Sequence, residues 1–155
     1  VAALLGSTID MLRPFATAHG VTVNATLEPA TTFGDSSRLT DAFTNLLKNA
    51  IEYNHDGGTV DVRSVTDGEW VVVSVQDTGT GIPSADLPHI FDRFYRADKS
   101  RARKVGGAGL GLAIAKQAIE SSHGTITCES AVGSGTTFTV RLPATAELPV
   151  DRPRG

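Results

Sequence analysis

The sequence predicts an α/β two-layer sandwich, in which helices cover one face of a mixed, mostly antiparallel sheet. Three segments place apolar residues at the three- and four-residue steps of amphipathic helices, whereas others alternate with the period of strands. The order along the chain is helix, strands, helix, hairpin, long connection, helix, hairpin. Only the strands that a helix joins can therefore pair in parallel, and the hairpins must be antiparallel.

The first part of the chain contains two predicted helices. Residues 2–18 form the first, the alternating segment 20–28 predicts a strand, and residues 31–34 a short extended piece. Asp35 is expected to cap the second helix, because its carboxylate can accept from the free N–H groups of the first turn. The apolar residues of this helix form one broad face: Leu39, Ala42, Phe43, Leu46, Leu47, Ala50 and Ile51.

A predicted hairpin follows, with strands over 59–65 and 69–77 and a tight turn at Thr66-Asp67-Gly68. Residues 78–108 then form a connection that is long for a compact domain, with a short helical piece in "SADLPHIFDRF". Connections of this length often serve as lids over a binding site. We therefore expect a lid here.

The last third predicts a helix over 109–122, ending at Gly124 in the left-handed position that commonly follows a helix. Strands over 125–130 and 136–142 complete the sheet as a second hairpin. The domain is thus expected to span 1–142. Residues 143–155 read as a flexible, Pro-rich tail.

Composition is that of one soluble globular domain, since the chain has 155 residues with 40% hydrophobic and 20% charged. A net charge of −3 does not favour nucleic acid as a partner, and no apolar run is long enough for a membrane span or direct membrane contact. Because Cys128 is the single cysteine, an internal disulfide is excluded, and its side chain is expected to be buried and to fill space in the core. Because the sequence begins mid-pattern without Met, we expect a fragment of a longer protein.

The segment "VGGAGLGLAIAK" (105–116) is a glycine-rich loop that opens onto a helix, an arrangement that commonly holds phosphate. A Walker A loop is excluded, because Leu112 and Ala113 stand where its Lys and hydroxyl belong. The dinucleotide fingerprint fails too, since its third glycine would fall on Leu112. A helix entry with glycines for close packing remains the alternative. The basic stretch 93–104 is either a mobile clamp for a polyanion or a solvated loop.

Asp77 is the first candidate site residue. It continues the parity of Val71, Val73 and Val75, so its carboxylate should point to the covered face where the strand ends. A carboxylate there needs a partner. It either caps the turn at Thr78-Gly79 or accepts a hydrogen bond from an exocyclic amine of a flat ring.

Two further motifs are candidates. Asn45 and Asn49 lie four residues apart, hence on one side of the second helix, where they are either solvated or, through an amide oxygen, a ligand for Mg²⁺ beside phosphates. In "GSGTTF", Gly133 and Gly135 fit a simple hairpin turn. Thr136 could instead add a hydroxyl to the ring pocket of Asp77.

Five motifs in order, "NLLKNAIEY", "DTGTGI", "IFDRFYR", "GGAGLGLAI" and "GSGTTF", resemble the N, G1, F, G2 and G3 boxes of two-component sensor histidine kinases. The resemblance covers nearly the whole chain up to Leu142. It implies the Bergerat ATP-binding fold of the GHKL superfamily, with an ATP lid, and it implies ATP and Mg²⁺ as the bound cofactors.

The resemblance also implies roles for particular residues. Asn49 would ligate the Mg²⁺ that bridges the ATP phosphates, with Asn45 near it. Tyr53 would pack against adenine, and Asp77 would accept from the adenine amine, assisted through water by Thr136. The remaining implied residues shape the ring pocket (Gly79, Gly81 and Ile82), anchor the lid (Phe91 and Phe94), close over the phosphates (Gly107, Gly109 and Gly111) or pack beneath them (Leu110).

One departure from the family pattern concerns the phosphates. Members often carry Lys or Arg three residues after the Mg²⁺-binding Asn, where this chain has Glu52. Lys48, one turn earlier, is expected only to pair with Glu52. The compensating cation is then expected in the lid, where the candidates are Arg96, Arg103 and Lys104.

Three functions remain open from the sequence: a kinase, an ATPase or an inactive nucleotide-binding module. Superfamily ATPases carry a Glu base at the first N-box position, where this chain has Asn45, whose neutral amide cannot take a proton. None of the four histidines fits a phosphoacceptor motif. The expected function is therefore to bind Mg-ATP and donate the γ-phosphate to a His on a separate dimerisation domain of the same kinase, for relay to a response regulator. The expected location is cytoplasmic, within a membrane-anchored parent protein.

Overall fold

The computed structural model describes residues 1–93, 95 and 111–145. Three α-helices, five strands and one 3₁₀ helix are formed in this part of the chain. They are α1 (Ala2–Ala18), β1 (Thr22–Leu27), α2 (Ser36–Glu52), β2 (Thr59–Asp67), β3 (Trp70–Asp77), η1 (Leu87–His89), α4 (Gly111–Ser121), β4 (Thr125–Ala131) and β5 (Gly135–Pro143).

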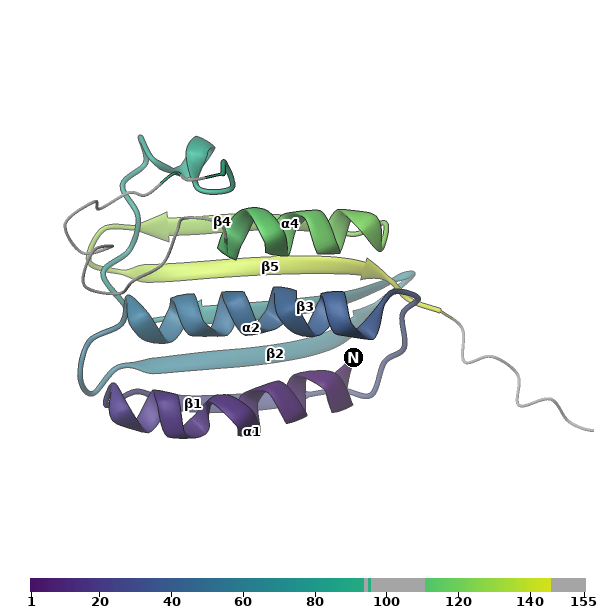
Figure 1. Ribbon diagram of the computed structural model, residues 1–155, viewed down its shortest axis with the longest axis horizontal. Coiled ribbons are helices and arrows are strands. Elements are labelled where there is room, and N and C mark those ends of the chain that lie inside the picture. Colours follow the sequence, from purple (N-terminus) through teal and green to yellow (C-terminus); the bar gives the residue numbers. More distant parts are fainter. Residues whose placement is uncertain (94, 96–110, 146–155) are drawn as a thin grey trace, which may run out of the picture.

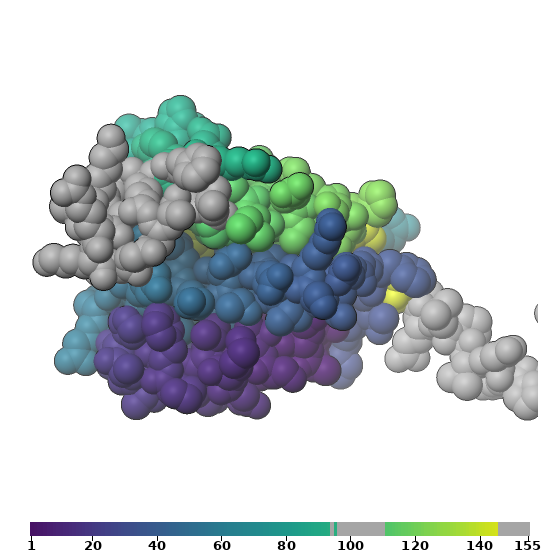
Figure 2. Space-filling model, viewed as in Figure 1, coloured from purple at the N-terminus to yellow at the C-terminus, as the bar shows by residue number. Residues whose placement is uncertain are grey.

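The five strands form one sheet in the order β1-β2-β3-β5-β4. Strands β1 and β2 are parallel, and every other neighbouring pair is antiparallel. All three α-helices lie on the same face of the sheet (Figure 1), and in the space-filling view α1, α2 and α4 form adjacent bands across that face (Figure 2). The predicted two-layer sandwich is confirmed, including the single parallel pair.

Helix α2 is the central helix and contributes to both parts of the core. The Asp35 carboxylate accepts from the backbone N–H groups of Ser37 and Arg38, which confirms the predicted N-cap. All seven apolar residues of its predicted face are buried. They pack on the inward side chains of β2 and β3, among them Val62 and Val73. This packing fixes where the opposite, polar edge of α2 presents its side chains.

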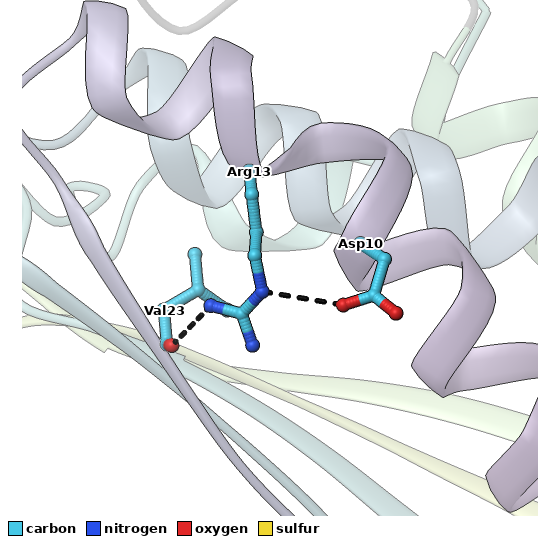
Figure 3. Close-up of polar contacts among 3 residues, drawn as sticks. All are labelled: Asp10, Arg13 and Val23. Carbon is cyan, nitrogen blue, oxygen red and sulfur yellow. Dashed lines mark hydrogen bonds and ion pairs between the residues drawn. The ribbon is translucent and has the colours of Figure 1, made fainter.

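Helix α1 is held against the edge strand by Arg13. The Arg13 guanidinium donates to the Val23 carbonyl at 3.3 Å and to the Asp10 carboxylate at 3.3 Å (Figure 3). Pro14 lies inside the helix and cannot donate to the Asp10 carbonyl. The contact from Arg13 to β1 therefore stabilises the helix at the turn that lacks one backbone hydrogen bond.

Two local predictions in the middle of the chain were wrong in detail. The first hairpin turn is not Thr66-Asp67-Gly68, because Asp67 pairs with Trp70 and only Gly68 and Glu69 lie between the strands. Gly68 has φ +59°, which matches the glycine-first, two-residue turn favoured by twisted hairpins. In the described part of "SADLPHIFDRF", the helical piece is the three-residue η1.

The predicted end of the third helix was wrong by one residue. His123, not Gly124, takes the left-handed position, with φ +62°. The His123 N–H donates to Glu120 O at 3.0 Å and the Gly124 N–H to Ile119 O at 2.9 Å, the pattern of a Schellman motif. Gly124 is needed for another reason, since a Cβ there would lie 2.5 Å from Arg141 O. Close packing on β5 selects the glycine.

Strand β5 runs to Pro143, one residue beyond the predicted strand. Ala144 forms a bridge with Thr32, and the Thr145 N–H donates to Thr31 O at 2.9 Å. These contacts attach the chain after β5 to the segment before α2. The rest of the predicted tail, 146–155, lies outside the described residues. Among the described helices, none combines the length and apolar character that crossing a bilayer requires.

Candidate functional site

Asp77 ends β3 on the helix-covered side and is the most buried carboxylate of the site, with 6% of its surface exposed. Its Oδ1 accepts from the backbone N–H of Gly79 at 2.9 Å and of Thr136 at 3.2 Å. Oδ2 has no hydrogen-bond partner among the described residues. Since no fully buried side-chain oxygen in this part of the chain lacks a partner, Oδ2 reaches the accessible surface. Asp77 thus caps the turn with one oxygen and offers the other to a ligand.

The electrostatics of Asp77 follow from this position. Burial raises the pKa of the Asp77 carboxyl above its usual value, while the two backbone hydrogen bonds from Gly79 and Thr136 lower it partway back. The raised pKa means that ionising Asp77 costs free energy in the folded protein. A hydrogen-bond donor at Oδ2 would favour the ionised form and offset that cost.

Glycines are required around Asp77 by close backbone approach. A Cβ at Gly79 would lie 2.4 Å from Tyr53 O, and a Cβ at Gly81 would lie 2.0 Å from Ala131 O. Gly81 also has φ +74°. The turn after β3 therefore runs directly between the end of α2 and the β4–β5 hairpin, which joins three distant parts of the sequence.

Ser130 is a site residue that the sequence analysis missed. Its Oγ accepts from the Ile82 N–H at 2.7 Å, donates to Gly135 O at 2.9 Å and lies 2.8 Å from Thr136 Oγ1. Thr136 in turn is bound to Asp77 through its backbone N–H at 3.2 Å. A single Ser in a strand gives little sequence signal. Its place opposite the predicted Thr136 in the hairpin register was the only clue.

Asn54 is a second missed residue, and it fixes the chain after α2. Its Nδ2 donates to Thr59 O at 2.9 Å, and its Oδ1 accepts from the His55 N–H at 2.9 Å and from Thr78 Oγ1 at 3.2 Å. This buried amide links the end of α2 to both strands of the first hairpin. The sequence signal was an Asn followed by Asp and Gly, a combination typical of turns.

Asn45 and Asn49 lie on the polar edge of α2, and both are half-buried. Neither side chain has a hydrogen-bond partner among the described residues. A Cβ built on Gly111, the first residue of α4, would lie 3.5 Å from Asn45 Oδ1, which places the start of α4 beside Asn45. The structure therefore brings the side-chain amide of Asn45 close to the start of α4.

Glu52, which departs from the family pattern, and its expected partner Lys48 lie near the end of α2. The Lys48 ammonium lies 5.8 Å from the centre of the Phe15 ring, on α1. Burial raises the pKa of Glu52, while Lys48 and His19 lower it through their charges. The predicted pairing of Lys48 with Glu52 is thus an electrostatic interaction rather than a short ion pair.

The other predicted residues within the described part surround the same corner of the fold. Tyr53 caps α2, and its carbonyl accepts from the Thr80 N–H at 3.1 Å. Ile82 and Phe91 both pack against the core, and the Phe91 ring lies 6.2 Å edge-on from that of Phe138. Several predicted residues lie outside the described part: Phe94, Arg96, Arg103, Lys104, Gly107, Gly109 and Leu110.

A metal ion at this site would depend on a ligand that brings its own oxygens. No group of three or more His, Cys, Asp or Glu side chains in the described part of the chain is arranged to hold one. The amide oxygens of Asn45 and Asn49 are hard donors that suit Mg²⁺ when phosphates complete its coordination. The donor set fits a metal that arrives with a nucleotide.

Comparison with known proteins agrees with this geometry. Residues 34–146 match the family model described as histidine kinase-, DNA gyrase B-, and HSP90-like ATPase. The sensor histidine kinase RppB of Synechocystis is 45% identical over 111 residues, which cover 72% of this chain and 24% of RppB. Across the first curated relatives, the chain spans about a quarter of their length.

Solved structures show the same fold. The mycobacterial sensor histidine kinase MprB matches with a TM-score of 0.82 and 31% identity, covering 92% of this chain and 94% of that one. Full-length ShkA, solved in complex with AMPPNP, matches with a TM-score of 0.79 and 26% identity, covering 94% of this chain and 30% of that one.

The chain belongs to the histidine kinase-, DNA gyrase B- and HSP90-like ATPase family, the GHKL superfamily predicted from its five boxes. Within that family, its sequence and fold are those of the catalytic, ATP-binding domain of two-component sensor histidine kinases. These are protein-histidine kinases, and the predicted Bergerat-type fold is confirmed.

Proposed function

We propose that this domain binds Mg-ATP and donates the γ-phosphate to a His on a separate dimerisation domain, for relay to a response regulator. The observation that carries the proposal is Asp77, whose Oδ1 is held by two backbone N–H groups while Oδ2 stays open at the end of β3. A rigid, one-sided acceptor suits the exocyclic amine of adenine. The AMPPNP complex of the related ShkA supports the choice of nucleotide.

The adenine end of the site is built by backbone and small residues. Gly79 and Gly81 let the turn after β3 pack directly against Tyr53 O and Ala131 O, and this turn is proposed to form one wall of the ring pocket. Thr136 adds a hydroxyl beside Asp77. The proposed roles of Tyr53, against the ring, and of Ile82, at its edge, rest on their positions in the two segments that flank Asp77.

The phosphate end is proposed at the polar edge of α2, beside the start of α4. Asn49 would hold Mg²⁺ through its amide oxygen, with Asn45 close by, and Mg²⁺ when bound neutralises charge on the phosphates. The chain itself positions the nucleotide and adds cations, for which Arg96, Arg103 and Lys104 remain the proposal. Gly107, Gly109 and Gly111 are proposed to close over the phosphates, with Leu110 beneath them.

Phosphoryl transfer, rather than hydrolysis, is favoured by the side chain at position 45. Asn45 is an amide with no hydrogen-bond partner among the described residues, and an amide cannot activate water by taking its proton. Transfer then needs only an in-line acceptor nitrogen, held by the dimerisation domain, and stabilisation of the charge on the γ-phosphate. The domain contributes geometry and charge, and the acceptor contributes the nucleophile.

The proposal is tested by activity with and without an acceptor. Alone, the chain should bind ATP but neither label itself on His nor hydrolyse ATP at a useful rate. A dimerisation domain that carries the acceptor His, added in cis or in trans, should become labelled with acid-labile, base-stable phosphate. Rapid hydrolysis by the chain alone would favour an ATPase. Tight ATP binding with no transfer to any such domain would favour an inactive nucleotide-binding module.

The metal role is tested separately. Titration of ADP with and without Mg²⁺ should show tighter binding with the metal, and Asn49→Ala should remove more of that gain than Asn45→Ala. If Asn49→Ala leaves the Mg²⁺ effect intact, the metal ligand lies elsewhere. As part of the same proposal, the domain acts in the cytoplasm, where ATP and response regulators are found, as part of a membrane-anchored parent protein.

A further inference from the structure

The β4–β5 hairpin carries a pair of hydroxyl groups next to Asp77 whose hydrogen-bond directions can be assigned. Ser130 and Thr136 are opposite each other in the hairpin register, and their hydroxyl oxygens are 2.8 Å apart. The Thr136 N–H donates to Asp77 Oδ1 at 3.2 Å, so the pair and the carboxylate share one corner of the site. Thr136 is itself buried. The direction of its O–H bond is therefore set by protein groups.

The Ser130 hydroxyl has one proton to give and two lone pairs with which to accept. It accepts from the Ile82 N–H at 2.7 Å and donates its proton to Gly135 O at 2.9 Å. With that proton used, the 2.8 Å contact with Thr136 is satisfied only if Thr136 donates. The Ser130 oxygen then has its full complement of three hydrogen bonds.

The consequence for Thr136 is a hydroxyl that can only accept from a ligand. Its proton is directed at Ser130, so only lone pairs remain for the pocket. Asp77 Oδ2 is an acceptor as well. From Asp77 and Thr136, the corner therefore presents two acceptors to a ligand. Two acceptors match the two hydrogens of an exocyclic amine, or waters held by it, and disfavour a carbonyl oxygen.

We infer that Ser130 is a specificity-determining positioning residue. Its Oγ accepts a hydrogen bond from the Thr136 hydroxyl, and this contact favours purines that carry an amine over those that carry a carbonyl oxygen at the same ring position. The inference rests on the proposed function, because it assumes that the purine lies at Asp77. Ser130 contacts no ligand in this account and acts only through Thr136.

Calorimetric titration of the whole chain with ADP and with inosine diphosphate tests the inference, since inosine carries a carbonyl oxygen where adenine carries the amine. The variant Ser130→Ala leaves the Thr136 proton free to turn toward the ligand. We expect the preference for ADP over inosine diphosphate to fall about three- to tenfold, the range of one hydrogen bond. Ser134→Ala, which removes a hydroxyl from the exposed turn of the same hairpin, is the matched control and should change neither affinity.

A second variant keeps the test sharp if Ser130→Ala unfolds. Thr136→Val removes the acceptor itself but leaves the Ile82–Ser130 hydrogen bond in place, so it should lower the same preference. Adding Ser130→Ala to Thr136→Val should then change the preference for ADP no further.

The single variant Ser130→Thr keeps a hydroxyl at position 130, so it should retain the wild-type preference for ADP that Ser130→Ala loses.

Four results would overturn the inference. If Ser130→Ala weakens both nucleotides equally, the residue is merely structural. If neither Ser130→Ala nor Thr136→Val changes the preference for ADP over inosine diphosphate, the two hydroxyl groups do not discriminate between the purines. If the wild-type chain binds neither nucleotide, the proposed function fails and takes the inference with it. Binding that is lost in Asp77→Asn but insensitive to Ser130 would refute the inference alone and leave the proposed function standing.

Discussion

Replacing Asp77 by Asn should weaken nucleotide binding without unfolding the protein. The two side chains have the same shape, and the Asn amide oxygen can take the place of Oδ1, where it still accepts from the N–H groups of Gly79 and Thr136. The reverse orientation would set an NH₂ group against those two donors. The NH₂ group must therefore occupy the place of Oδ2, facing the ligand.

The expected loss of ADP affinity follows from replacing Oδ2 by an NH₂ group. The wild-type carboxylate accepts a charge-assisted hydrogen bond at Oδ2, and the Asn variant presents a donor to the donor of the adenine amine. A hydrogen bond to a charged group contributes about 1.5–3 kcal/mol. ADP affinity should fall about 10- to 150-fold. Stability should change little, since weaker hydrogen bonds at Oδ1 are offset by the removal of a buried charge whose ionisation is unfavourable.

The assay is calorimetric titration with ADP, together with thermal unfolding of the same samples. Asp67→Asn is the matched control, because it makes the same charge change at the exposed, opposite end of the same hairpin. An Asp77→Asn protein that melts like the wild type and binds ADP equally well would refute the placement of adenine at this carboxylate. A variant that fails to fold would refute the argument that its amide oxygen replaces Oδ1.

The remaining predictions concern pH, backbone strain and the thiol. Because burial raises the pKa of Asp77, its carboxyl protonates at a higher pH than an ordinary Asp. ADP affinity should therefore begin to fall on acidification at a higher pH than it would with an ordinary Asp, and Asp77→Asn should remove that dependence. Folding stability should depend on pH in the opposite direction to ADP affinity. The stabilising contribution of Asp77 is present below its unfolded-state pKa and is lost as pH rises through the raised folded-state pKa. Urea unfolding at several pH values would measure this loss. Gly81→Ala should destabilise more than Gly57→Ala in urea unfolding, because both residues have positive φ but only Gly81 has a backbone oxygen 2.0 Å from the added Cβ; equal losses would show that the contact relaxes. The pKa of Cys128 is raised to about 12 by burial and by the charges of Asp77 and Glu129, so iodoacetamide at pH 8 should label it far more slowly in the folded chain than in urea, as mass spectrometry would detect.

Much of the fold could be predicted because periodicity and capping are local signals. The α2 helix is the clearest case, since its cap and all seven core residues follow from one segment of sequence. The misplaced end of the third helix arose where a tertiary contact decides. The Schellman motif puts His123 in the left-handed position because β5 needs Gly124 for close approach, and no local signal reveals that contact.

The candidate site was predictable in its carboxylate but not in its supporting hydrogen bonds. Strand parity placed Asp77 on the covered face, and the structure agrees. Ser130 and Asn54 were missed because their importance lies in partners far along the chain: Ile82 is 48 residues from Ser130, and Thr78 is 24 residues from Asn54. Such contacts depend on strand order, which the motifs alone do not give.

The hydrogen bond from Thr136 to Asp77 joins residues 59 positions apart, so the corner that would receive a purine exists only when β3 and β5 are both in the sheet. Unfolded or partly assembled chains cannot bind there. A ligand that binds only the folded corner therefore stabilises the whole domain. It adds about 2.7 kcal/mol to the unfolding free energy when the free ligand concentration is a hundred times the dissociation constant. Cellular nucleotide concentration would then set the stability of the folded domain as well as the occupancy of its site.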